Sequence, residues 1–382
     1  MSVCGLSDPS HESAAQSHAL TATIGGLATA LPCVRQGQEE LAAEFARLWD
    51  LHGPGLDRWR RIVRGSGIRE RAAILPIAGV PRLSTAARMR LYEEHAPALA
   101  HGAAAGAITS AGVPADRVTD LIVVSCTGFS APGVDVDLIE SLGLRPTVRR
   151  LTVGFMGCFG AITGLRAALG VCAADPSAVV VVVCVELCSL HLRATPDAAN
   201  QVASALFADG AAGVVVLGRD AARDRAGDDE STDRLMVLGP GASRLLPESR
   251  KEMSWRITDS GFAMTLSPRA PASLGANVRG ALGGALGAEA GSVAVHPGGP
   301  AILDAIEEAL EKGCARDIEI AREVLRDHGN MSSPSVLFVL EEFLAQRVWR
   351  PINLLAFGPG LTIERITLGP AQAGRSNGVC EG

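Results

Sequence analysis

The sequence predicts an α/β fold in which sheets and helices form layers, arranged as two packed halves. Two observations predict it. Segments with strand character alternate along the chain with helical segments, which is the pattern of layered α/β proteins. The chain also has 382 residues, of which 47% are hydrophobic and 43 are glycine, so it can build a large core of closely packed elements.

The first half shows the alternation most clearly. Residues 84–112 are typical of a helix that a Ser-Thr pair opens and a glycine closes, and the strand DLIVVSC follows from Asp120. The strand LTVGFM then leads into the helix FGAITGLRAALGVCAA, which an Asp-Pro pair ends. The run AVVVVVCV at 178–185 is apolar throughout, which predicts a buried central strand.

A charged stretch at 219–234 interrupts this pattern and predicts the boundary between the halves. We therefore expect an N-terminal half at 1–220 and a C-terminal half at 221–382. The second half also alternates strands and helices, with a strand SVAV, a helix from about Ala301, a helix near Ser333 and the closing strands NLLAF and LTIERITL.

Charge and composition exclude several classes of protein. The net charge of -6 gives no general attraction to nucleic acid or to an anionic membrane, so we expect no nucleic-acid partner. The valine-rich run is far shorter than the roughly 18 residues of a membrane helix, so we expect no membrane insertion. The N-terminus MSVCGLSDPSHES lacks the basic start and apolar core of a secretory signal, which predicts a cytoplasmic protein.

The nine cysteines predict reduced thiols, because their number is odd and no C-x-x-C occurs. Cys184 and Cys188 are spaced to lie on one face of a strand. No second pair of cysteine or histidine accompanies them, so we expect packing and no metal site.

Cys158 lies in GFMGCFG at the start of an apolar helix. Unpaired N–H groups and the helix dipole at such a position can lower the pKa of a thiol, and the flanking glycines would leave the sulfur accessible. Most buried cysteines are inert, so a structural role stays open. Small residues recur at every fourth position in this helix and predict that another backbone approaches it closely, at Gly160, Gly164, Ala168 and Cys172.

Two further polar residues lie at the ends of predicted elements. His296, in AVHPGGPAILD, follows a strand and precedes a Gly-Gly turn, where an imidazole can face a cleft. Asn330, in HGNMSSPSVLFVL, directly precedes a helix start. Each alone is more often structural. Together, Cys158, His296 and Asn330 suggest thiolate chemistry at an acyl carbon, with an oxyanion stabilised by the latter two.

Two other functions are compatible with these three residues. A papain-like hydrolase has a similar cysteine-to-histidine spacing, but its cysteine lies near the mature N-terminus in a C-G-[SA]-C-[WY] setting that is absent here. A non-catalytic protein that binds acyl chains is the second alternative.

Five motifs in order resemble one family, the type III polyketide synthases of the chalcone and stilbene synthase superfamily. They span nearly the whole chain: GFMGCFG, SALFADGAAGVVV, VHPGGPAILD, GNMSSPSVLFVLE and AFGPGLTIE. The resemblance implies a thiolase-like fold with two similar halves in α/β/α/β/α layers. It also implies an acyltransferase that condenses malonyl-CoA with an acyl-CoA, needs no cofactor and forms a homodimer.

Carried over by motif, the resemblance makes Cys158 the nucleophile, His296 and Asn330 the oxyanion donors, and Phe207 an aromatic gate. Other positions would line the pocket. These are Cys126, Cys188, Glu186, Trp255, Met264 and Ser332. Arg58 and Arg61, in RWRRIVR, match the place where the family holds CoA phosphates, although a solvated helix face is the simpler reading.

Two features of the sequence bear on the product. Cys126 stands where the plant enzymes carry a threonine, and it weakens a relay through Glu186 and Ser332 that the family links to aldol closure. This favours a pyrone over a resorcinol. The segment APGVDVDLIESLGL, from Ala131, resembles bacterial alkylpyrone and alkylresorcinol synthases, which take fatty acyl starters.

Overall fold

The computed structural model describes residues 22–226, 236–283, 291–310, 314–348 and 350–370. Nine strands form one mixed sheet in the order β11-β12-β13-β8-β1-β7-β6-β4-β5. Their bounds are β1 Ala22–Ala30, β4 Asp120–Ser125, β5 Arg149–Gly154, β6 Val179–Leu187, β7 Asp209–Gly218, β8 Met236–Leu245, β11 Ser292–Val295, β12 Ile352–Gly358 and β13 Thr362–Pro370. Two described residue pairs join β1 to β8, so strands from the two halves of the chain meet there.

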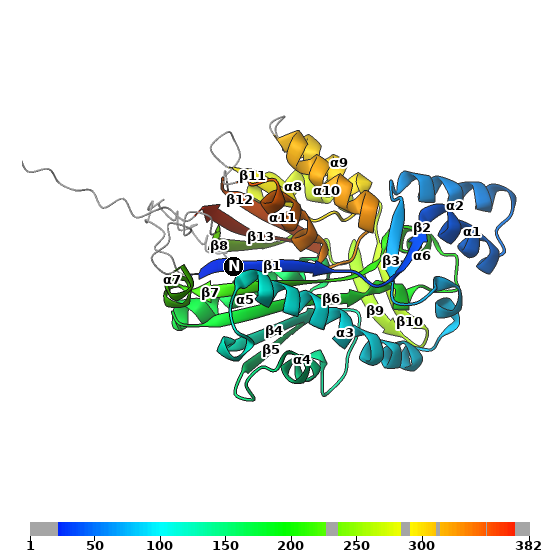
Figure 1. Cartoon of the computed structure of the whole chain (residues 1–382). Coiled ribbons are helices and arrows are strands. Elements are labelled where there is room, and N and C mark those ends of the chain that lie inside the picture. Colours follow the sequence, from blue (N-terminus) through cyan, green and yellow to red (C-terminus); the bar gives the residue numbers. More distant parts are fainter. Residues whose placement is uncertain (1–21, 227–235, 284–290, 311–313, 349, 371–382) are drawn as a thin grey trace, which may run out of the picture.

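Helices cover both faces of the sheet and also fill its middle (Figure 1). Helices α5 (Gly160–Ala174) and α11 (Ser335–Ala345) each contact strands of both halves, so they form a central layer. Helices α3 (Thr85–Ala111) and α4 (Val134–Leu142) cover one outer face. Helices α8 (Ala270–Ala281), α9 (Pro300–Ala309) and α10 (Ala315–His328) cover the other. This α/β/α/β/α order confirms the predicted thiolase-like fold.

Strand β6 shows why the valine-rich run is buried on both sides. Val180, Val182 and Cys184 belong to the core that also contains α5. The alternate residues, Val179, Val181, Val183 and Val185, belong to the core that contains α3 and α4. Because side chains alternate across a strand, an all-apolar run can serve two cores at once. The prediction of a buried central strand is confirmed.

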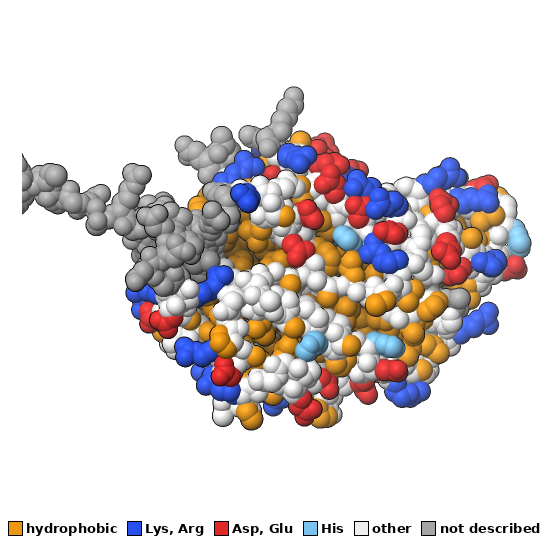
Figure 2. Space-filling model, viewed as in Figure 1, with side chains coloured by type: hydrophobic (Ala, Val, Ile, Leu, Met, Phe, Trp, Pro, Cys, Tyr) orange, Lys and Arg blue, Asp and Glu red, His pale blue; other side chains and the backbone are white. Residues whose placement is uncertain are grey.

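Smaller elements surround this frame. Helices α1 (Gln38–Leu48) and α2 (Gly53–Gly65) pack on β2 (Val34–Gly37), β3 (Glu70–Ala73) and α6 (Ala198–Leu206) at one end of the molecule (Figure 1). Strands β9 (Met253–Thr258) and β10 (Gly261–Leu266) form a separate two-stranded sheet. On the face seen in Figure 2, cationic and anionic side chains are interspersed around a band of hydrophobic ones.

Several expectations need correction or addition. Helix α10 was not predicted, although Ile318, Ala321, Val324 and Leu325 are buried at helical spacing. Cys188 does not share a strand with Cys184, because β6 ends at Leu187 and a 3₁₀ turn begins there. The charged stretch at 219–234 begins as helix α7 (Arg219–Ala226), and its remainder lies outside the described residues, as does the N-terminal segment 1–21.

One described helix, Gly157–Ala174, is long and apolar enough to cross a membrane by length and composition, with a mean hydropathy of 1.5. It is α5 with the turn that precedes it. Its position between the two parts of the sheet explains the apolar composition, because α5 contacts strands on opposite sides.

The small residues of α5 fit against neighbouring strands. A methyl group on Gly164 would lie 2.9 Å from Val124 Cγ2 and from Val182 Cγ1. The same group on Gly160 would lie 2.7 Å from Val124 Cγ1. The packing at these two glycines is therefore close, but valine side chains of β4 and β6 make it, and not another backbone as predicted.

Two substitutions in this helix test the packing. Gly164→Ala is expected to lower the free energy of unfolding by about 1–3 kcal/mol, because the added methyl group overpacks the core. Gly170→Ala on the same helix should raise it by about 0.5–1 kcal/mol, because nothing lies within 4 Å and only helix propensity changes. Chemical denaturation of both variants measures the difference, and equal effects of the same sign would contradict it.

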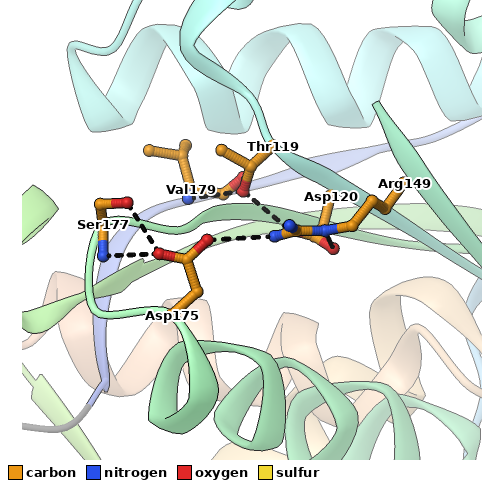
Figure 3. Close-up of polar contacts among 6 residues, drawn as sticks. All are labelled: Thr119, Asp120, Arg149, Asp175, Ser177 and Val179. Carbon is orange, nitrogen blue, oxygen red and sulfur yellow. Dashed lines mark hydrogen bonds and ion pairs between the residues drawn. The ribbon is translucent and has the colours of Figure 1, made fainter. Parts of the chain in front are cut away.

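A polar network aligns the starts of three parallel strands (Figure 3). Arg149, the first residue of β5, donates to both carboxylate oxygens of Asp120, the first residue of β4, at 2.7 Å each. It also reaches Asp175 at 3.3 Å, and Thr119 connects Asp120 to the start of β6. Since β4, β5 and β6 start together, their carboxyl ends lie at one edge, where ligand sites of α/β sheets form.

Candidate active site

Cys158 lies at the carboxyl edge of these strands, in the 3₁₀ turn Gly157–Phe159 between β5 and α5. The backbone turns sharply before it, with φ of 60° at Phe155 and 68° at Gly157. A methyl group on Gly157 would lie 2.7 Å from Pro359 Cδ, so only glycine fits this corner. The turn delivers the sulfur to the junction of the two halves.

The sulfur of Cys158 is enclosed. It packs with Cys188 and Phe207, and the side chain of Met264 lies against the same cluster. Burial raises the pKa of Cys158 to about 12, while hydrogen bonds from Ser332 and Asn330 act in the opposite direction. The expected lowering of the resting pKa by the helix N-terminus is therefore wrong, because desolvation outweighs the local dipoles.

Asn330 is fixed by backbone and side-chain bonds at once. Its N–H donates to the Leu206 carbonyl and its carbonyl accepts from Ala208 N–H, both at 2.9 Å, so it pairs with Phe207 between them. The Oδ1 atom accepts from Ser332 N–H at 2.8 Å, which leaves Nδ2 as the donor toward the site. That amide reaches the carbonyl of Gly298 at 3.3 Å, in the loop after His296.

His296 follows β11, and its N–H donates to the Leu355 carbonyl at 2.8 Å. The ring is buried, with 1% of the residue exposed, so the expected exposure in a cleft is not found. Neither ring nitrogen has a hydrogen-bond partner among the described residues. Burial lowers the pKa of His296 to about 3, so the imidazole is neutral and one ring nitrogen carries an uncommitted proton.

Glu186, at the end of β6, organises a second group of residues beside the cysteine. Its carboxylate accepts from Cys126 N–H at 3.0 Å, from the Cys126 thiol at 3.3 Å and from the Thr127 hydroxyl at 2.7 Å. Ser333 donates to it at 2.6 Å. Burial raises the pKa of Glu186, and these bonds act in the opposite direction. Cys126 Sγ lies 3.5 Å from Ser332 Oγ, which completes a path toward Cys158.

Sequence patterns missed several of these partners. Thr127 and Ser333 are next to the predicted site residues Cys126 and Ser332, but no sequence pattern predicts that both side chains contact Glu186.

His191 is another buried residue near the site. Its ring stacks on Phe262 with centroids 3.9 Å apart, and Nε2 lies 2.6 Å from the Thr127 carbonyl. Phe262 N–H donates to Nδ1 at 3.2 Å, so Nε2 is the protonated nitrogen of His191.

His191 should make stability depend on acidity. Burial lowers its pKa from 6.5 to about 4, so the unfolded chain takes up the proton first as the pH falls. The contribution of neutral His191 to the free energy of unfolding is present above pH 6.5 and is lost progressively toward pH 4. We expect His191→Gln to be less stable than wild type at pH 7 but to lose about 2 kcal/mol less between pH 7 and pH 4.5. Urea titrations at both pH values test this, and parallel losses would contradict it.

Two cavities adjoin the site from different sides. One, of about 850 Å³, is lined by Cys126, by Trp255 and other apolar residues of β9 and β10, and by the exposed cations Arg250, Lys251 and Arg256. The other, of about 450 Å³, lies between α2, α6 and the loop containing Gly298. The rings of Phe207 and Trp255 are 6.0 Å apart and tilted by 53°. Phe207 therefore belongs to the cysteine cluster and is close to Trp255, which lines the larger cavity.

Family models match both halves of the chain. The model described as chalcone and stilbene synthases, N-terminal domain, matches residues 10–221, and the corresponding C-terminal domain matches residues 238–370. The chain belongs to the chalcone and stilbene synthase family. It is a type III polyketide synthase, an acyltransferase, and the papain-like alternative is set aside.

Relatives and solved structures agree with this. The type III polyketide synthase described here is 35% identical over 360 residues to 1,3,6,8-tetrahydroxynaphthalene synthase of Streptomyces peucetius subsp. caesius, covering 91% of this chain and 92% of the relative. It is 34% identical to bisdemethoxycurcumin synthase of Oryza sativa subsp. japonica, covering 74% and 73%. It superposes on PKS-I of the brown alga Ectocarpus siliculosus with a TM-score of 0.83 at 28% identity, covering 91% and 98%. For the C-terminal type III domain of Steely1, a type I/III hybrid from Dictyostelium, the TM-score is 0.82 at 25% identity, covering 91% and 99%.

In this type III polyketide synthase, Arg58 and Arg61 lie exposed on α2, whose residues Ile62 and Gly65 line the smaller cavity. Gln201 Oε1 accepts from Arg58 Nε at 3.1 Å and from Nη2 at 2.6 Å. The guanidinium is thus held by α6, while the residue remains exposed.

Proposed function

We propose that this type III polyketide synthase transfers an acyl group from an acyl-CoA to Cys158 and extends it with malonyl-CoA. The observation that carries the proposal is the set of donors around the sulfur. Ser332 and Asn330 reach Cys158, and Asn330 in turn binds the loop of His296, whose ring nitrogens are uncommitted. Such donors suit an oxygen that gains negative charge.

The steps follow from these groups. The Cys158 sulfur attacks the acyl-CoA carbonyl carbon, and the tetrahedral oxygen accepts hydrogen bonds from His296 and Asn330. The thiol proton leaves with the departing CoA sulfur, and a thioester remains on Cys158. Malonyl-CoA then loses carbon dioxide, and its enolate oxygen accepts hydrogen bonds from Asn330 and His296. The enolate carbon attacks the Cys158 thioester and releases the sulfur as a thiolate, which takes up a proton from solvent. The product is a CoA thioester that is longer by two carbons, and repeated loading and extension give the short polyketide that cyclises. This series of steps consumes no redox equivalent and requires no metal or cofactor.

The starter is proposed to be a fatty acyl group. Met253, Trp255, Ile257 and Phe262 give the larger cavity apolar walls that suit an alkyl chain, and the segment from Ala131 resembles alkylpyrone and alkylresorcinol synthases. The smaller cavity beside Arg58 and Arg61 is proposed to admit the CoA arm, with its phosphates at the arginines. The N-terminal half, 1–220, would supply the nucleophile and the C-terminal half, 221–382, the donors.

A pyrone is the proposed product, with a resorcinol as the alternative. Aldol closure would need a well-connected relay from Glu186 to Ser332. Here the intermediate member is the thiol of Cys126, a weaker hydrogen-bonding group than a hydroxyl, with contacts of 3.3 and 3.5 Å. Lactonisation needs no such relay.

A homodimer in the cytoplasm, where CoA thioesters are available, is also proposed. Phe129 is 67% exposed and Phe155 62% exposed, and both lie near the edge strand β5. A second copy of the chain would cover these side chains and the strand edge. Sedimentation at micromolar concentration should give twice the chain mass, and a monomer would exclude the dimer.

The activity test combines the protein with malonyl-CoA and a series of straight-chain acyl-CoAs, with aromatic acyl-CoAs as the comparison. We expect carbon dioxide, free CoA and alkylpyrones, identified by mass spectrometry. Products only from aromatic starters, or from malonyl-CoA alone, would reject the fatty starter and keep the chemistry. Unchanged substrates in every arm would reject the activity and favour an acyl-binding protein.

A further inference from the structure

Arg71 is a buried arginine that touches the backbone of the site. It lies in β3, is 2% exposed, and its Nη1 donates to the Phe207 carbonyl at 2.6 Å. Burial lowers its pKa to about 10, while Asp209 acts in the opposite direction, so the guanidinium is charged near neutral pH. A buried charge is costly unless it is paired or hydrogen-bonded. The groups that Arg71 contacts therefore indicate which part of the structure it stabilises.

The stem of Arg71 also supports the segment that carries Asn330. Gly329 has a φ of 73°, and a methyl group there would lie 2.9 Å from Arg71 Cγ and Cδ. The arginine therefore fills the space that a side chain would need. The pair of backbone bonds between the Phe207 and Asn330 segments lies directly beside it. One side chain thus holds both segments.

Asp209, whose charge acts on Arg71, connects this support to the turn that begins at Cys188. Asp209 accepts from Ser189 N–H at 2.7 Å, from Ser189 Oγ at 2.6 Å and from Ile74 N–H at 2.9 Å. Ser189 follows Cys188, which packs against Cys158. Asp209 and Arg71 therefore stabilise Phe207, Asn330 and the Cys188 turn from behind the site.

We propose that Arg71 is a positioning residue that fixes Phe207 and the Asn330 amide relative to the Cys158 sulfur. The inference rests on the proposed function, in which that amide binds the developing oxygen anion. Displacement of a donor by about 1 Å can cost roughly 10²-fold in rate, because the bonds are needed most in the transition state. Arg71 itself touches no substrate, so binding of CoA at α2 should be preserved.

The test compares Arg71→Lys and Arg71→Met with Arg88→Lys and Arg88→Met. Arg88 is a matched control: it is fully buried and donates to the carbonyls of Leu83, Leu190, Leu192 and Pro81, without contacting Phe207 or Asn330. We expect kcat for condensation to fall about 10–100-fold in the Arg71 variants, with KM for malonyl-CoA changed less than about threefold. The Arg88 variants should lose thermal stability with a far smaller change in kcat.

A second readout does not depend on polyketide formation. The rate at which iodoacetamide alkylates Cys158 in folded protein, followed by mass spectrometry, reports how Phe207 and Asn330 enclose the sulfur. It should rise several-fold in Arg71→Lys and stay near wild type in Arg88→Lys. If wild type makes no polyketide but alkylation behaves in this way, the proposed function fails and the positioning role stands. Equal kcat, KM and alkylation rates in the Arg71 and Arg88 variants would overturn the positioning role.

Discussion

Cys158→Ala should abolish product formation while malonyl-CoA still loses carbon dioxide. Without the sulfur no acyl-enzyme forms, so condensation should fall on the order of 10⁴-fold or more, as in other enzymes that lose their nucleophile. Decarboxylation needs donors to the enolate oxygen, and the bonds that hold Asn330 to Ser332 and Gly298 do not involve the Cys158 sulfur. Carbon dioxide release and polyketide yield, measured in the same reaction, separate the two steps.

Cys188→Ala is the matched control, because it removes a buried thiol from the same cluster. It changes cavity shape without removing the nucleophile, so activity should stay within about tenfold of wild type. Mass spectrometry of protein quenched after acyl-CoA addition should find the acyl group on the peptide containing Cys158 in both wild type and Cys188→Ala. Loss of decarboxylation to the same extent as condensation in Cys158→Ala would show that the sulfur serves both steps.

Element ends were predictable from the sequence because local signals mark them. Ser84 caps α3 by accepting from Ala87 N–H, and Gly112 ends the same helix in the left-handed conformation, as the serine and glycine signals indicate. Cys158, His296 and Asn330 all lie at such ends, so their placement between elements could be inferred. The five motifs then indicated which chemistry these positions carry.

Contacts between distant segments were not predictable in this way. Glu186 and Ser333 are 147 positions apart, and Arg71 and Phe207 are 136 apart. No periodicity relates such residues, because the fold as a whole brings them together. The error in the resting pKa of Cys158 has the same origin: its local position at a helix start was recognised, but the enclosure by Phe207, Cys188 and Met264 was not.

Asn330→Asp should impair both chemical steps, in contrast to Cys158→Ala. The aspartate keeps the size of the side chain and an oxygen to accept from Ser332 N–H, but it replaces the Nδ2 donor with a second oxygen. That oxygen would repel an enolate, so decarboxylation and condensation should each fall about 10²–10³-fold, the range for removal of one oxyanion donor. Radiolabelled carbon dioxide release and product formation measure the two rates.

Ser332→Ala provides the comparison for this variant. It removes a hydroxyl that reaches Cys158 but keeps the Ser332 N–H that orients Asn330, so decarboxylation should remain close to wild type. The thermal unfolding midpoint of both variants checks that the fold is intact. If Asn330→Asp decarboxylates malonyl-CoA as fast as wild type, the amide is not an enolate donor, and its bonds to Gly298 and Ser332 serve only to hold the loop of His296 in place.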